Sequence, residues 1–181
     1  MKASGDYILS FSGLSMGRHE FRYRLDDAFF ACFPEGDIRQ ADVTVDLTLE
    51  RAERLMRLHF DFQGRFKTVC DRCLRELDCP VAFQDEVIVR FVSETAGKED
   101  EDNLWWVDEH QDKLDLSQYL YETVALQRPL QWFCPEDGNG VSTCDAAFLE
   151  RMDAKGKTEP AVALSEDNMA VLKALGKKFN I

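Results

Sequence analysis

The fold is decided by residues 43–62, which read VTVDLTLERAERLMRLHFDF. Apolar and polar residues alternate in the first half, and the alternation resumes after the polar turn at residues 50–53. A period of two places one set of side chains on a buried face and the other set in solvent. These residues therefore predict two neighbouring antiparallel strands, each buried on one face.

The same alternation continues on both sides of this stretch. A third long strand is expected over residues 77–91. Shorter elements are expected elsewhere: strands at 7–11, 21–25 and 104–107, and helices at 26–33, 116–124 and 145–152. Asp115 or Ser117 can cap the middle helix. Together these elements predict an α+β fold, namely a curved antiparallel sheet built from long hairpins with a few peripheral helices.

The domain organisation follows from breaks in this pattern. Residues 1–153 are expected to form one domain, interrupted by an acidic loop at about 93–112 that holds eight acidic residues and one lysine. Such a charge run is typical of a solvated segment. Residues 154–181 are expected to be a linker and a C-terminal helix that begins at Ser165. The apolar stripe of this helix, Met169, Leu172 and Leu175, would dock weakly on the domain or bind a partner.

Composition excludes several classes of protein. The 181 residues are 45% hydrophobic, which suffices for a sizeable core, but the formal net charge is −12. A protein this acidic is repelled by phosphate backbones and anionic lipid, so it is not a general nucleic-acid coat. No apolar run is long enough to span a membrane, and the start lacks a signal-peptide pattern. We therefore expect a soluble, cytoplasmic protein with no membrane partner.

The sharpest motif is the CxxC pair Cys70 and Cys73, which lies between two expected strands. A tight turn with this spacing lets two thiolates converge on one tetrahedral metal ion, but the pair is only half of a zinc site. Cys134 and Cys144 are the candidates for the other half, with His110 as an alternative ligand. The competing interpretation is that these are two unrelated pairs of buried cysteines.

Redox catalysis is the other interpretation of a CxxC pair. It requires a helix N-terminus that lowers the pKa of the first thiol, and here strands flank the pair. Cys70 is therefore expected to show no unusual thiolate character, and Cys32 and Cys79 are expected to be core residues. Nucleotide-binding, metalloprotease and serine-hydrolase motifs are absent from the sequence. We expect a protein that is not an enzyme and has no small-molecule substrate.

Basic residues gather around the CxxC pair. Residues 51–75 carry a local net charge of +4, and four of the basic side chains lie nearest the pair: Arg65, Lys67, Arg72 and Arg75. In an acidic protein such a patch can contact phosphate or an acidic partner. Alternatively, these are ordinary strand residues that face solvent and pair with the acidic loop.

Three segments of the sequence resemble the YceD family, the bacterial large ribosomal RNA subunit accumulation proteins. They are the strand leading into CxRC at residues 67–74, the Leu/Pro-rich helix end at 122–130, and the segment at 168–175. Cys134 and Cys144 match the positions of the family's later metal-ligand candidates. The resemblance extends from about residue 40 onward.

The resemblance implies a metal-binding protein that helps large-subunit rRNA to accumulate. The predicted function is a non-catalytic ribosome-biogenesis factor that binds precursor rRNA and holds a structural zinc ion through Cys70, Cys73, Cys134 and Cys144. The alternative is a protein-interaction adaptor that holds a basic ribosomal protein without touching RNA, which the acidic net charge favours. Only the resemblance, and not the residue patterns, points to the ribosome.

Overall fold

The computed structural model describes residues 7–33, 36, 38–93, 99 and 103–156. The chain divides into two compact units, residues 1–134 and 135–181. The first unit contains β1 (Ile8–Ser10), β2 (Gly17–Asp26), α1 (Asp27–Phe30), β3 (Arg39–Arg51), β4 (Leu55–Val69), β5 (Glu76–Val92), β6 (Leu104–Asp108), β7 (Lys113–Asp115) and α2 (Ser117–Ala125). The second unit contains α3 (Ala146–Gly156) among its described residues.

The main sheet has five strands in the order β2-β3-β4-β5-β6. Its first four strands pair antiparallel in chain order, as the period-two pattern predicts. The expectation of a wholly antiparallel sheet is wrong at one edge, where β6 pairs parallel to β5 with Ile88 opposite Leu104. A separate antiparallel pair joins β1 to β7, which the sequence did not predict.

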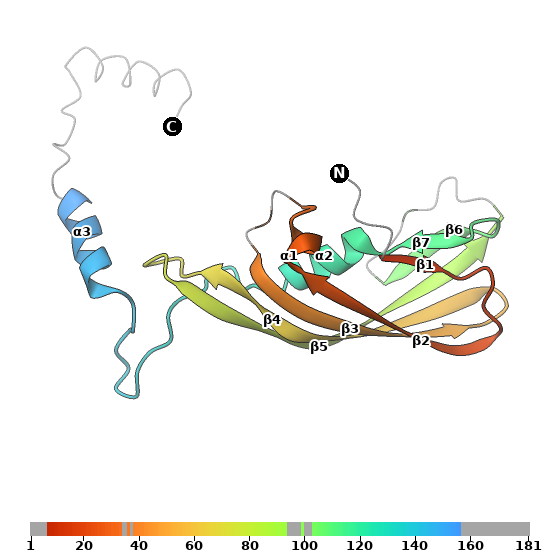
Figure 1. The fold of residues 1–181 in the computed structure, drawn as a ribbon, viewed down its shortest axis with the longest axis horizontal. Coiled ribbons are helices and arrows are strands. Elements are labelled where there is room, and N and C mark those ends of the chain that lie inside the picture. The colour runs from red at the N-terminus through yellow and green to blue at the C-terminus, as the bar shows by residue number, and fades with distance from the viewer. Residues whose placement is uncertain (1–6, 34–35, 37, 94–98, 100–102, 157–181) are drawn as a thin grey trace, which may run out of the picture. The chain divides into compact units, whose positions relative to one another are not determined.

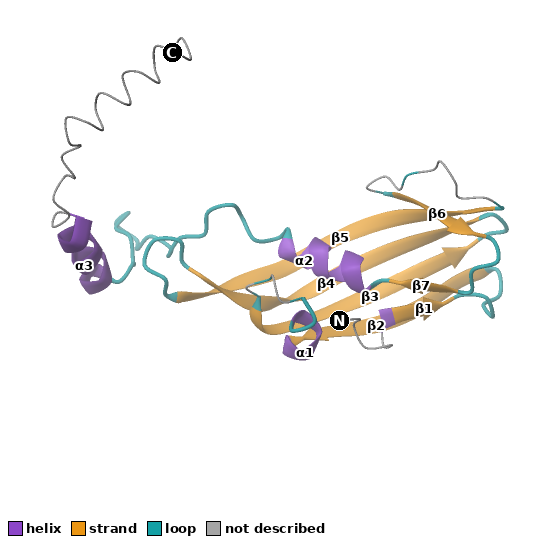
Figure 2. Ribbon diagram, turned by 90° about the horizontal axis from the view of Figure 1, so that it is seen from above, coloured by secondary structure: helices purple, strands orange, loops and turns teal. Residues whose placement is uncertain are grey.

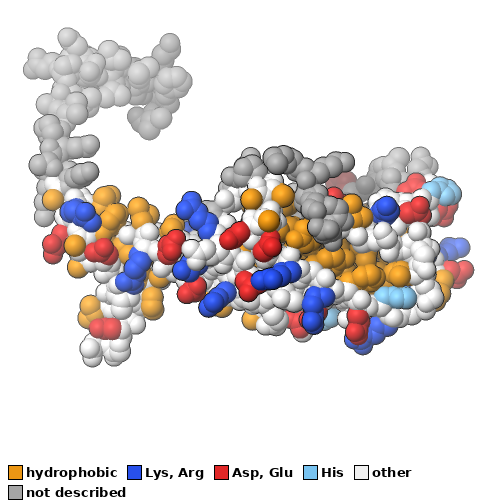
Figure 3. Space-filling model, in the orientation of Figure 1, with side chains coloured by type: hydrophobic (Ala, Val, Ile, Leu, Met, Phe, Trp, Pro, Cys, Tyr) orange, Lys and Arg blue, Asp and Glu red, His pale blue; other side chains and the backbone are white. Residues whose placement is uncertain are grey.

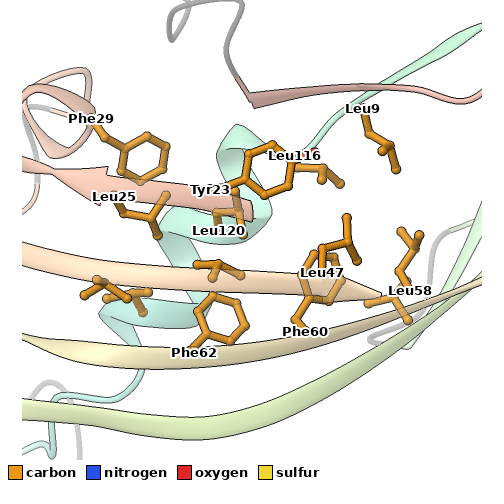
Figure 4. Close-up of a cluster of buried hydrophobic side chains, with 14 of the residues drawn as sticks. Leu9, Tyr23, Leu25, Phe29, Leu47, Leu58, Phe60, Phe62, Leu116 and Leu120 are labelled. Atoms are coloured by element: carbon orange, nitrogen blue, oxygen red, sulfur yellow. The ribbon is translucent and has the colours of Figure 1, made fainter. Parts of the chain in front are cut away.

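One face of this sheet forms the core of the first unit. Alternate residues of β3 and β4 are fully buried on that face: Val43, Val45, Leu47, Leu49, Met56, Leu58, Phe60 and Phe62. Helices α1 and α2 and the β1–β7 pair lie on the same side of the sheet (Figures 1 and 2). Figure 4 shows Leu9, Leu116 and Leu120 facing the sheet residues across this layer. Burial of each large apolar side chain contributes roughly 1.5–3 kcal/mol to stability.

The opposite face of the sheet is polar and has acidic and basic side chains in close alternation. The Arg22 guanidinium pairs with the Asp46 carboxylate, and Arg24 pairs with Asp42 across β2 and β3. Figure 3 shows basic and acidic side chains interspersed on the visible surface of the strands. These exposed pairs stabilise the fold little, but they neutralise one another along the outer face.

The expected helices are present, with adjusted ends. α1 is shorter than expected and begins where the Asp26 carboxylate accepts the backbone N–H groups of Ala28 and Phe29. Before α2, the Asp115 carboxylate accepts the N–H of Ser117. The expected C-terminal helix after Ser165 lies outside the described residues, as does the part of the expected acidic loop at residues 94–98 and 100–102. Within the described part of the chain, no helix combines the length and apolar character needed to cross a membrane.

Gly64 allows β3 and β4 to approach closely near the end of the sheet that carries the CxxC pair. It has a φ of 153°, and a Cβ atom there would lie 2.2 Å from the backbone oxygen of Asp42. A side chain at this position cannot be accommodated without moving a strand, because the atom it would meet belongs to the backbone. Beyond this point the β3–β4 register shifts between Arg39 and Asp42.

Candidate metal centre

The connection between β4 and β5 is a tight loop that brings the CxxC sulfur atoms to one side. The backbone N–H of Cys70 donates to the carbonyl of Arg75 at 2.8 Å, and that of Leu74 donates to the carbonyl of Cys70 at 2.9 Å. Leu74 adopts the left-handed conformation, with a φ of 59°. The two hydrogen bonds and this backbone reversal close the loop. As a result, both Cys70 and Cys73 are buried although the loop lies at the end of two strands.

Asp71 joins this loop to the segment that follows α2. Its backbone N–H donates to the carbonyl of Trp132 at 2.9 Å, while its carboxylate accepts the N–H of Trp132 at 2.6 Å. The same carboxylate pairs with the Arg128 guanidinium at 2.7 Å, and both side chains are mostly removed from solvent. This arrangement holds the chain two residues before Cys134 against the CxxC loop. The Cys134 sulfur accordingly lies 3.5 Å from that of Cys73.

Four cysteines form a group that could hold a metal ion: Cys70, Cys73, Cys134 and Cys144, with all four sulfur atoms within 4.8 Å of one another. Around a zinc ion with tetrahedral Zn–S bonds of about 2.3 Å, neighbouring sulfur atoms are about 3.8 Å apart. The 3.5 Å separation between Cys73 and Cys134 is close to that spacing. Four thiolates are the donor set of a closed structural zinc site. The chemistry and spacing of these residues therefore fit zinc.

The expectation that Cys70 behaves as an ordinary thiol is wrong. Burial raises the pKa of Cys70, but backbone N–H groups of Cys73, Arg72 and Cys134 and the Cys134 thiol hydrogen-bond to its sulfur, and the resulting pKa is about 6. The N–H of Arg72 lies 3.4 Å from that sulfur. Hydrogen bonds to the charged form favour it, so the loop itself does what a helix N-terminus does elsewhere. A thiolate near neutral pH is also the form that binds metal.

The remaining candidate ligands lie elsewhere. His110 is exposed and its ring lies 4.0 Å from the Glu109 carboxylate, so it is not part of the cysteine group. Cys79 is buried on β5, as expected of a core residue, and burial raises the pKa of its thiol. Cys32 is half-buried and its thiol lies 3.5 Å from the Ala28 carbonyl oxygen.

The four basic residues nearest the CxxC pair differ in their surroundings. Arg65 is exposed on β4, whereas the Lys67 ammonium lies 3.8 Å from the Glu76 carboxylate. The Arg72 guanidinium lies over the ring of Phe133, 4.7 Å from its centroid, and Arg75 is exposed where β5 is about to begin. Arg72 and Arg75 therefore belong to the loop that carries Cys70 and Cys73, and Lys67 is partly neutralised.

Sequence reasoning missed the residues that support this centre. Asp71, Arg128, Trp132 and Phe133 position the cysteines or stack on Arg72, yet they lie about 60 positions apart in two segments. Asp71 occupies one of the two positions between the cysteines, and nothing in the CxxC spacing marks it as a link. The sequence feature that could have led to these residues is the Leu/Pro-rich helix end at 122–130, because it contains Arg128.

The fold is α+β, with helices packed on one face of the main sheet. The site is a candidate metal centre of four cysteines. A family model described as "Large ribosomal RNA subunit accumulation protein YceD" matches residues 58–176, about two thirds of the chain. The chain belongs to this family, as its CxRC segment predicted. The family's description names a role in accumulation of large-subunit rRNA and names no reaction. No curated protein and no solved structure gives a significant match.

Proposed function

We propose that this protein is a non-catalytic, cytoplasmic factor that promotes the accumulation or assembly of large-subunit rRNA and holds one structural zinc ion. The observation that carries the proposal is the group of four close cysteines in a chain of this family. Bound zinc would supply structural cross-linking: it would offset part of the negative charge of the four thiolates and fix the four cysteine positions relative to one another. No step of this role requires an acid, a base or a nucleophile.

Contact with rRNA is proposed to run through the basic residues at this centre. Arg72 and Arg75 are exposed, and Phe133 beneath Arg72 keeps 40% of its surface accessible. An arginine beside an accessible aromatic ring can pair with phosphate while the ring stacks on an unpaired base. On the outer sheet face, by contrast, Arg22 and Arg24 are paired with carboxylates.

Reversal of two charges tests this contact. The variant Arg72→Glu with Arg75→Glu should lose binding to naked large-subunit precursor RNA, whereas Arg57→Glu with Arg90→Glu should bind as the natural protein does. The control pair is exposed on β4 and β5, the two strands that the CxxC loop connects, and lies away from that loop. Replacing Arg72 and Arg75 by Ala should flatten the dependence of log K on log salt by about one to two units.

The outcome in cells follows from the same variants. In cells depleted of the natural protein, the control pair should restore the ratio of large- to small-subunit rRNA, and the Arg72 and Arg75 reversal should not. Unchanged RNA binding by the reversed protein contradicts contact through Arg72 and Arg75, and a lack of RNA binding by the natural protein contradicts direct rRNA contact altogether. In that case the second candidate function holds, which is an adaptor for a basic ribosomal protein. The net charge of −12 is the observation that favours this second function.

A further inference from the structure

A second surface lies between β5, β6 and α2, distinct from the cysteine group. It is a groove of about 860 Å³ whose lining includes Phe83, Asp85, Trp105, Asp115, Tyr119 and Glu122. The groove is open on one side and lies on the sheet face that α2 covers. Because its walls are regular elements, namely strands β5 and β6 of the main sheet and helix α2 on that sheet, the groove is preformed rather than made by a loop.

Aromatic rings form the floor of this groove. The ring of Trp105 meets that of Tyr119 edge-on, with centroids 5.0 Å apart, and Tyr119 in turn packs 4.9 Å from Phe60 of the core. The Tyr119 hydroxyl donates to the Asp85 carboxylate at 2.7 Å. Burial and this carboxylate raise the pKa of Tyr119, so its phenol stays neutral and keeps donating. Phe60 of the core therefore supports the Tyr119 ring, and the Asp85 carboxylate holds its hydroxyl group.

Among the described residues, the charged side chains that line the groove are all carboxylates. Asp85, Asp115 and Glu122 all contribute to its lining, and no lysine or arginine is found among the described residues that surround it. On the outer sheet face, in contrast, Asp42 and Asp46 are neutralised by arginines of β2. Asp115 accepts a backbone N–H before α2, and Glu122 accepts from the amide of Gln118. Neither contact cancels the negative charge.

We propose that this groove binds an extended, Lys/Arg-rich segment of a partner protein. Aromatic faces attract ammonium and guanidinium groups, and carboxylates form charge-assisted hydrogen bonds with the same groups. An RNA phosphate is repelled by three carboxylates, so a basic peptide fits the groove and a nucleic acid does not. The inference goes beyond the proposed function, because it concerns another surface and holds whether or not the cysteine centre binds zinc.

Peptide binding to the full-length protein tests the inference. The probe is a fluorescent nine-residue peptide of alternating Arg and Ser, measured by anisotropy, with the matching Glu and Ser peptide as a negative control. The double variant Asp115→Asn with Glu122→Gln should weaken binding about 3- to 10-fold, because each exposed charge pair contributes modestly. Trp105→Leu should weaken it a further 2- to 5-fold through loss of the cation–π contact.

The matched control is Glu20→Gln with Glu86→Gln, which removes two exposed carboxylates from β2 and β5 outside the groove. This control should leave peptide affinity within about 1.5-fold of the natural protein. Equal weakening by both double variants means that net charge alone attracts the peptide, and the inference is then wrong. It is also wrong if the groove variants bind the peptide normally, or if they lose binding to single-stranded RNA instead. Each variant is first checked for native circular dichroism, so that loss of folding is not scored as loss of binding.

Discussion

The Cys70 sulfur accepts hydrogen bonds from backbone N–H groups of two segments, the CxxC loop and the chain at Cys134. These donors hold the thiol in its charged form even though it is buried. The effect comes mostly from backbone groups, with the Cys134 thiol as a further, side-chain donor. It depends on the loop keeping its closed shape, which the Cys70 and Leu74 hydrogen bonds provide.

In protein freed of metal by a chelator, we expect the ultraviolet absorbance of the Cys70 thiolate to rise with a midpoint near pH 6, well below the ordinary 9.0. The native pKa lies below the unfolded value, so the native state gains stability from the thiolate above about pH 9. That contribution is lost as the pH falls through 6. The metal-free protein should therefore unfold more easily at pH 6 than at pH 9.

The variant Cys70→Ser should remove both the low midpoint and this part of the pH dependence, and Cys79→Ser should retain them. A metal-free protein whose lowest thiol midpoint stays near 9 contradicts the hydrogen-bonding account.

At the scale of elements, Asp71 is the link between the β4–β5 loop and the chain that leaves α2. It makes two hydrogen bonds with the backbone of Trp132 and an ion pair with Arg128. All three contacts are partly shielded from water, so they are stronger than the pairs on the outer sheet face. The position of Cys134 beside Cys73 depends on this link.

We expect Asp71→Ala to release residues 128–134 from the loop, at a cost of about 1–3 kcal/mol, because it leaves the Trp132 N–H and Arg128 without the carboxylate. Hydrogen exchange should then be faster at residues 128–134 and unchanged in the middle of β3 and β4. The control is Asp78→Ala, which removes an exposed carboxylate from β5. Unchanged exchange in the 128–134 segment contradicts the linking role.

The elements themselves were largely predictable from the sequence. Period-two alternation identified β3, β4 and β5, because half-buried strands must alternate: Val43, Val45 and Leu47 are fully buried and the residues between them are not. Alternation identifies the buried face but not the neighbouring strand, so the parallel pairing of β6 was missed. The three residues of β7 are too few to show a period.

The candidate site was predictable only in its cysteines. CxxC spacing is a local signal and identified Cys70 and Cys73, whereas Asp71, Arg128 and Trp132 meet through the tertiary fold. The groove was missed for the same reason, since Asp85, Trp105 and Glu122 come from three elements and none is unusual by itself.

At the scale of the whole molecule, a net charge of −12 coexists with two local surfaces of opposite character in the first unit. The cysteine centre carries Arg72 and Arg75, and the groove between β5, β6 and α2 carries carboxylates. A global charge sets long-range attraction, but local surfaces decide which partner is bound. Under the two proposals above, the protein contacts RNA through one surface and a basic protein through the other.

The central claim is that the four cysteines hold one zinc ion, and the metal content of the native protein tests it most directly. The natural full-length protein is purified without chelator or added metal, and zinc per chain is measured by elemental mass spectrometry. We predict about one zinc per chain, because four thiolates close a structural tetrahedral site. Cys73→Ser should lose the metal and unfold more easily, whereas Cys32→Ser, outside the group, should keep it. A folded protein that carries no stoichiometric metal, with all four thiols free to react with a thiol reagent on denaturation, would contradict the account.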